Sequence, residues 1–169
     1  LEGRPSESGR SVILKHNSDG TTSDIIPDNF NSRNAVHEYG GGSFVAREGV
    51  VFFTNWEDQL IYKVFEDKII PIKESSVIPM GIRYADLTLS NDGKWIFCIR
   101  ETHNEGKEAK NELVAVSTTS SDTVVLASGR DFYSSPRPNP TSNQICWLEW
   151  DHPNMPWDGS VLWVADFNG

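Results

Sequence analysis

Histidine and carboxylate side chains are the residues of this sequence best able to carry out acid–base or metal chemistry. Two adjacent pairs, His37-Glu38 and Asp151-His152, combine the two types. Consecutive residues on a strand point to opposite faces, so we do not expect either pair to act on one proton. No two histidines have HExxH or similar metal-ligand spacing, so no metal or other cofactor is expected. We expect these residues to serve in turns or in packing.

A run of three glycines, Gly40-Gly41-Gly42, could in principle cradle a phosphate. It lacks the Lys-Ser/Thr pair and the helix that a phosphate-binding loop requires. The overlapping segment GGSFV, residues 41–45, is the nearest approach to the nucleophile motif G-x-S-x-G, but it lacks the final glycine and a following helix. We therefore expect a sharp backbone bend here and no catalytic residue in this chain.

The elements that must position these residues are short strands. Runs rich in β-branched and aromatic residues, such as GVVFFTN, KWIFCIR and QICWLEW, alternate with Gly, Asp, Asn and Ser punctuation. Helical periodicity is scarce, so the pattern predicts an all-β protein. KWIFCIR is apolar on both faces, which predicts a strand buried between two neighbouring sheets.

The sequence also repeats. SNDGKWIFC, which begins at Ser90, aligns with NPTSNQICW, which begins at Asn139, 49 residues later. The first residues, 1–15, align with residues 148–164, so that Leu1-Glu2 matches Leu148-Glu149. A period of roughly 40–50 residues with about four short strands in each unit is typical of a β-propeller. A two-sheet sandwich is the alternative, but its strands would more often alternate cleanly between apolar and polar residues.

The phase of the repeat predicts a partial β-propeller of four-stranded antiparallel blades, with about two whole blades and two partial ones, in a single segment that spans 1–169. Partial blades expose unpaired strand edges, so an edge-paired or domain-swapped homodimer is a further expectation. The expected units are a partial blade at 1–36, whole blades at 37–76 and 77–129, and a partial blade at 130–169.

Three carboxylates stand at repeat-equivalent strand ends. Glu101 ends one strand, and Glu149 and Asp151 end its equivalent one period later. They would lie at the same end of neighbouring blades, where an acidic ring could attract the protonated amino terminus of a peptide. The competing interpretation is ordinary solvated surface charge.

The loop DHPNMPWDG, residues 151–159, joins the last two strands of the sequence. Its two prolines cannot donate to a sheet ladder, so strand pairing should stop near Asp151. The aromatic and sulfur-containing side chains in this loop and directly before it are expected to face a pore or a partner domain, or else to shelter the edge of their own blade. These side chains are Trp150, Met155 and Trp157.

Composition limits the partners. With 37% hydrophobic and 23% charged residues the chain should be globular, and no run is long enough for a membrane span. A net charge of −9 makes nucleic acid and anionic membranes unfavourable partners. Cys98 and Cys146 lie in apolar runs and are expected to be reduced thiols, and a leader peptide is not evident, so we expect a cytoplasmic protein.

Four segments in order, VHEYGGGSF (36–44), RYADLTLSNDGKW (83–95), DFYSSPRPNP (131–140) and WLEWDHPNMPWDG (147–159), carry a resemblance that spans nearly the whole chain. Together they resemble the dipeptidyl aminopeptidase/acylaminoacyl-peptidase branch of the prolyl oligopeptidase family of serine peptidases. The resemblance implies an N-terminal β-propeller that precedes a C-terminal α/β-hydrolase domain with a Ser-Asp-His triad.

The hydrolase half of that family is absent from these 169 residues, so no triad residue can be assigned. We expect this chain to be a non-catalytic propeller portion that gates peptide access and packs on the hydrolase domain, without peptidase activity of its own. The alternative is a stand-alone propeller-like module that binds a protein or a peptide.

Overall fold

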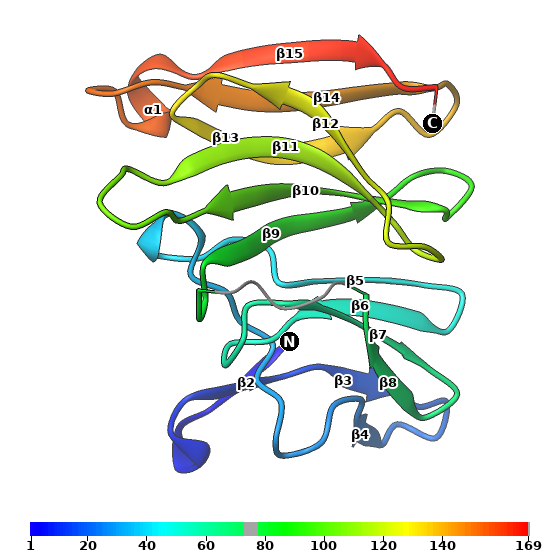
Figure 1. Cartoon of the computed structure of the whole chain (residues 1–169). Coiled ribbons are helices and arrows are strands. Elements are labelled where there is room, and N and C mark those ends of the chain that lie inside the picture. The colour runs from blue at the N-terminus through cyan, green and yellow to red at the C-terminus, as the bar shows by residue number, and fades with distance from the viewer. Residues whose placement is uncertain (73–77, 169) are drawn as a thin grey trace.

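The computed structural model describes residues 1–72 and 78–168, and almost all of their regular structure is β-strand (Figure 1). This confirms the predicted all-β fold of partial propeller blades. The expected boundary between the second and third units, at residues 76 and 77, and the end of the last unit at 169 lie outside the described residues. No helix within the described ranges is both long and apolar enough to cross a membrane.

Two antiparallel sheets have four strands each, and in both the strands follow one another in chain order. The first contains β5 (Phe44–Arg47), β6 (Val50–Thr54), β7 (Ile61–Phe65) and β8 (Lys68–Pro71). The second contains β9 (Ile82–Leu89), β10 (Trp95–Thr102), β11 (Lys110–Ser117) and β12 (Thr123–Ser128).

The remaining strands form smaller sheets at the two ends of the stack in Figure 1. Towards the C-terminus a three-stranded sheet contains β13 (Phe132–Pro138), β14 (Gln144–Trp150) and β15 (Val161–Asp166). Towards the N-terminus β1 (Glu2–Arg4) pairs with β2 (Arg10–Val12), and β3 (Leu14–His16) pairs with β4 (Thr22–Asp24).

The two segments that align in sequence at the ends of the chain share one local structure. β1 is joined to β2 through the helical turn η1 (Pro5–Glu7), and β14 is joined to β15 through the short helix α1 (Pro156–Gly159). Both pairs of strands are antiparallel. The proline in the first turn of each helix suits that position because its missing N–H would be unpaired there in any case.

Strand β10 lies between two cores, as its apolar pattern predicts. Phe97 and Ile99 pack in one cluster with residues of β13 and β14, including Tyr133. Ile96 and Cys98 point the other way, into a cluster that includes residues of β6 and β7. Neither Cys98 nor Cys146 forms a disulfide within the described chain.

The first strands of successive sheets, β5, β9 and β13, lie next to one another. Asp86 in β9 and Ser135 in β13 both have positive φ angles, near +58° and +55°, beside interruptions of register in their sheets. They are 49 residues apart, which is the repeat offset, so the sequence repeat includes a β-bulge.

The Asp86 carboxylate connects three successive units. Its Oδ1 atom accepts a hydrogen bond from the Gly42 amide at 2.7 Å, and its Oδ2 atom accepts one from the Ser135 amide at 2.9 Å. A Cβ atom on Gly41 would lie only 2.6 Å from Asp86 Oδ1, so glycine is needed there. Gly40 has a φ of +83°, which confirms the expected backbone bend.

Replacing Asp86 with alanine should lower the free energy of unfolding by about 1–3 kcal/mol, because two amides between strands lose their acceptor. Chemical denaturation measures this loss, and hydrogen exchange should accelerate at Gly42 and Ser135. D86N, which keeps one carbonyl oxygen, should lose less. The exposed loop variant E108A serves as the control and should change stability little. Equal losses in D86A and E108A would contradict the bridging role.

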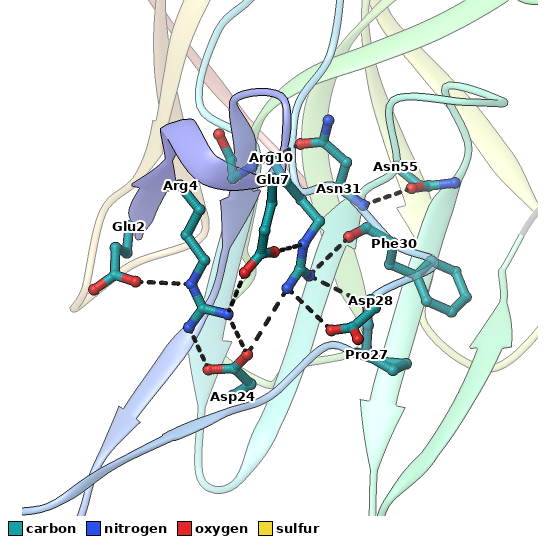
Figure 2. A network of polar contacts seen from close by, with 11 residues as sticks. Glu2, Arg4, Glu7, Arg10, Asp24, Pro27, Asp28, Phe30, Asn31 and Asn55 are labelled. Atoms are coloured by element: carbon teal, nitrogen blue, oxygen red, sulfur yellow. Dashed lines mark hydrogen bonds and ion pairs between the residues drawn. The ribbon is translucent and has the colours of Figure 1, made fainter.

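An arginine–carboxylate network holds the N-terminal hairpin to the chain that follows it (Figure 2). Arg4 contacts Glu7 and forms a bidentate pair with Asp24, with two distances of 2.7 Å. Arg10, which is buried, contacts Glu7 at 2.6 Å and Asp28 at 3.3 Å. The hydrogen bond from Arg4 is the main reason that the pKa of Asp24 is lowered.

Candidate functional site

Glu101 lies at the end of β10 and is almost completely buried, with 3% of its side chain exposed. Its Oε1 atom is 3.2 Å from Arg83 Nη1 and 2.7 Å from His103 Nε2. Its Oε2 atom accepts a hydrogen bond from the His37 amide at 2.8 Å. This carboxylate is therefore a centre of local contacts and not a freely solvated charge.

Glu149 and Asp151, at the equivalent end of β14, share one arginine. Arg130 Nε lies 3.1 Å from Glu149 Oε1, and Arg130 Nη1 lies 2.6 Å from Asp151 Oδ2. Trp147 Nε1 donates to the second oxygen of Glu149 at 3.1 Å. A hydrogen bond from the Asp131 amide, together with Arg130, holds the pKa of Asp151 below its ordinary value.

We call these residues at one end of β9, β10, β13 and β14 the rim. The sequence predicts three of its five carboxylates at this end, Glu101, Glu149 and Asp151, but Glu38 and Asp131 were not expected there, nor were the two arginines that pair with the carboxylates. A usable signal existed, since an arginine stands at the start of β9 and just before β13. The rim contains five carboxylates and two arginines and therefore stays acidic: Glu38, Glu101, Asp131, Glu149 and Asp151 with Arg83 and Arg130.

Glu38, Glu101 and His103 lie close enough together to suggest a metal site, with ligand atoms within 4.8 Å of one another. However, Arg83 Nη1 is 2.7 Å from Glu38 Oε1 as well as 3.2 Å from Glu101 Oε1. The guanidinium group therefore supplies the positive charge between these carboxylates, and the cluster does not fit a metal ion.

His37 and Glu38 lie in the helical turn η2 (Val36–Glu38), with φ angles of +54° and +67°. Asp151 and His152 likewise follow the end of β14. The strand geometry that was assumed for both pairs is therefore wrong. The expected roles in turns and packing are confirmed for His37, whose ring packs against other rings, and for Glu38, which pairs with Arg83.

The rim also contains a set of contacting rings, which we call the aromatic layer. Phe132 and Trp150 stack with ring centroids 5.3 Å apart, and His37 meets both rings edge to face. His152 packs on Phe132 with a centroid distance of 4.8 Å. The η2 turn, which binds Glu101 through its backbone, thus also contacts the next sheet through the His37 side chain.

Stability should fall as the pH drops from 7.5 to 5.5, in part because of His37. Burial lowers the pKa of His37 below its ordinary value of 6.5, although the Glu101 and Asp86 charges oppose this shift. Below about pH 6.5 the unfolded chain then binds a proton more readily than the folded chain, which favours unfolding. Denaturation of the wild type and H37F at both pH values measures the effect, and an equally steep loss in H37F would contradict it.

The loop after β14 divides into a buried and an exposed part. Trp150 is 4% exposed, and its ring contacts both Phe132 of its own sheet and His37 of the η2 turn. Met155 and Trp157 lie before and within α1 and are 44% and 76% exposed. The structure therefore brings Glu101, Glu149, Asp151 and Trp150 together at the rim and leaves the other two outside it.

A hollow of about 260 Å³ lies at the opposite end of these strands, away from every residue proposed from the sequence. Trp95, Phe97 and Phe167 form its aromatic wall, and Asp92 and Gln144 add polar groups. The two segments that align in the sequence repeat, which begin at Ser90 and Asn139, both contribute to its walls, but the repeat alone gave no reason to propose a site there.

Sheets of four antiparallel strands, packed in chain order around adjoining first strands, define the chain as a segment of a β-propeller. Over 99% of its length it is 33% identical to a Mycobacterium tuberculosis puromycin-hydrolyzing peptidase, with a TM-score of 0.89. A puromycin hydrolase in complex with PGG is 29% identical over 97% of the chain, with a TM-score of 0.85. Together with the four sequence segments, these matches show that the chain resembles a propeller segment of peptidases of the prolyl oligopeptidase family.

The chain spans about 28% of the length of these peptidases. TolB from Acinetobacter baumannii, 14% identical over 88% of the chain and 33% of its own length with a TM-score of 0.55, shares the fold alone. No family model and no curated protein sequence matches the chain.

Proposed function

We propose that the chain is the non-catalytic propeller portion of a cytoplasmic serine exopeptidase of the dipeptidyl aminopeptidase/acylaminoacyl-peptidase type. It would limit which peptides reach a hydrolase domain and would pack against that domain. The observation that carries the proposal is the 33% identity over 99% of this chain to a part of a puromycin-hydrolyzing peptidase.

The charge of the rim supports an exopeptidase in particular. The rim has more carboxylates than arginines, and the Glu38 side chain is 78% exposed to solvent. A local excess of negative charge attracts a positively charged amino terminus and repels free carboxylates. The rim would therefore act as an electrostatic filter and not as a reacting centre.

Binding of a short peptide with a free amino terminus, and of puromycin, tests the filter. We expect NMR titration to show shifts at rim amides for the free peptide and weaker shifts for its N-acetylated form. E38Q/D151N should weaken binding at least about threefold, because two negative charges leave the rim. The matched control E66Q/D67N removes two exposed carboxylates elsewhere and should have no effect.

Binding that ignores N-acetylation and the rim variant would contradict the filter and favour a stand-alone peptide-binding module. The absence of activity in this chain is tested separately with a fluorophosphonate probe that labels active serines. Stoichiometric labelling would contradict the non-catalytic role.

A further inference from the structure

Arg33 differs from the other arginines of the chain because its guanidinium group has no partner among the described residues. It forms no ion pair and donates no side-chain hydrogen bond, whereas each of the seven other arginines donates at least one. Arg33 is exposed, so its N–H donors are open to a ligand. A guanidinium group has no acceptor, so its ligand must present oxygen atoms, and a carboxylate matches its planar fork.

The Arg33 side chain lies on the indole ring of Trp56, with 4.7 Å between the guanidinium carbon and the ring centroid. The backbones of both residues are held in place. The Arg33 amide donates to the Thr54 carbonyl at 3.1 Å, and the Trp56 amide donates to the Asn31 carbonyl at 2.9 Å. Contact with the ring holds the guanidinium group in one orientation, so less conformational entropy is lost when a carboxylate binds it.

Arg33 stands at the same end of the sheets as the rim. Trp56 follows the end of β6, and the rim lies where β10 and β14, the second strands of the next two sheets, end. Two residues after Arg33, the Ala35 carbonyl accepts a hydrogen bond at 2.8 Å from Nη1 of Arg83, a rim residue. Arg33 and Glu38 are close in the sequence, so their Cα atoms are at most about 18 Å apart.

We propose that Arg33 binds the terminal carboxylate of a short peptide whose amino terminus lies at the rim. The proposal rests on the proposed function and adds the second end of the ligand to it. The excess of carboxylates at the rim repels the carboxylate of the peptide, which therefore binds the free guanidinium group beside the rim. An extended peptide spans at most about 3.6 Å per residue, so peptides of about two to five residues can reach from Glu38 to Arg33.

Titration of three forms of trialanine into the ¹⁵N-labelled chain tests the proposal: free at both ends, amidated at the carboxyl end, and acetylated at the amino end. Amidation should weaken binding at least about threefold in the wild type and should have no effect in R33M. The Nε–Hε resonance of Arg33 should shift with the free acid and not with the amide. The control R137M removes an arginine near the other end of β13 and should discriminate as the wild type does.

The two peptide modifications separate this proposal from the one on which it rests. If amidation had no effect in the wild type, or the same effect in R33M, the role of Arg33 would be overturned, while a loss on acetylation would still support the filter. If R33M removed an effect of amidation but acetylation had none, the carboxylate site would stand and the filter would be refuted. A chain that binds none of the three forms would overturn both. Circular dichroism confirms that the variants are folded.

Discussion

Phe97→Ala is expected to lower the free energy of unfolding by about 3–5 kcal/mol, the usual cost of deleting a buried phenylalanine ring. Phe97 lies on β10, is 2% exposed and packs against the sheet that contains β13 and β14. Its ring also meets Phe167 edge to face, with centroids 4.9 Å apart. Alanine would leave a cavity where two blades meet, so the loss should appear in a urea denaturation curve.

The control for this prediction is Val125→Ala. Val125 lies on the outer strand β12 and is 46% exposed, so its truncation should cost less than about 1 kcal/mol. Ile96→Ala removes a buried side chain on the opposite face of β10 and should cost about 2–5 kcal/mol. If Phe97→Ala and Val125→Ala were equally mild, β10 would not be buried between two sheets.

Arg83→Met is expected to destabilise the chain by about 3–5 kcal/mol, because it leaves the Glu101 carboxylate buried without its arginine. Glu101 is 3% exposed and would keep only the contacts with His103 and with the His37 amide. Methionine preserves most of the apolar stem of arginine, so the loss combines the unpaired charge of Glu101 with the lost hydrogen bond to the Ala35 carbonyl and the lost ion pair with Glu38. Chemical denaturation at neutral pH measures it.

Two further variants separate this effect from a general loss of charge. Lys94→Met breaks an ion pair with Asp92 that is 3.5 Å long and has a 74% exposed lysine, so it should cost less than about 0.5 kcal/mol. Arg83→Met combined with Glu101→Gln removes both charges and should recover much of the lost stability. A double variant no more stable than Arg83→Met alone would refute an electrostatic cause.

The architecture could be predicted from the sequence because strand formation and burial follow local patterns. The doubly apolar run around Phe97 indicated a strand between two cores, and the structure places it there. The 49-residue offset that aligns Ser90 with Asn139 also relates the bulges at Asp86 and Ser135. A repeated pattern of side chains requires a repeated backbone, so the periodicity was sufficient to predict blades.

The chemistry of the rim depended on tertiary contacts. Glu101 and Glu149 looked like free charges at strand ends, yet each is buried against an arginine that lies 18 or 19 residues away in the sequence. Asp86 gave no signal of its own, because its acceptor role depends on amides contributed by the neighbouring blades. The sequence by itself determined which segments form strands and how they repeat, since those properties depend on neighbouring residues. Only the tertiary structure decided which charges meet, because strand register and blade packing bring together side chains that no local pattern connects.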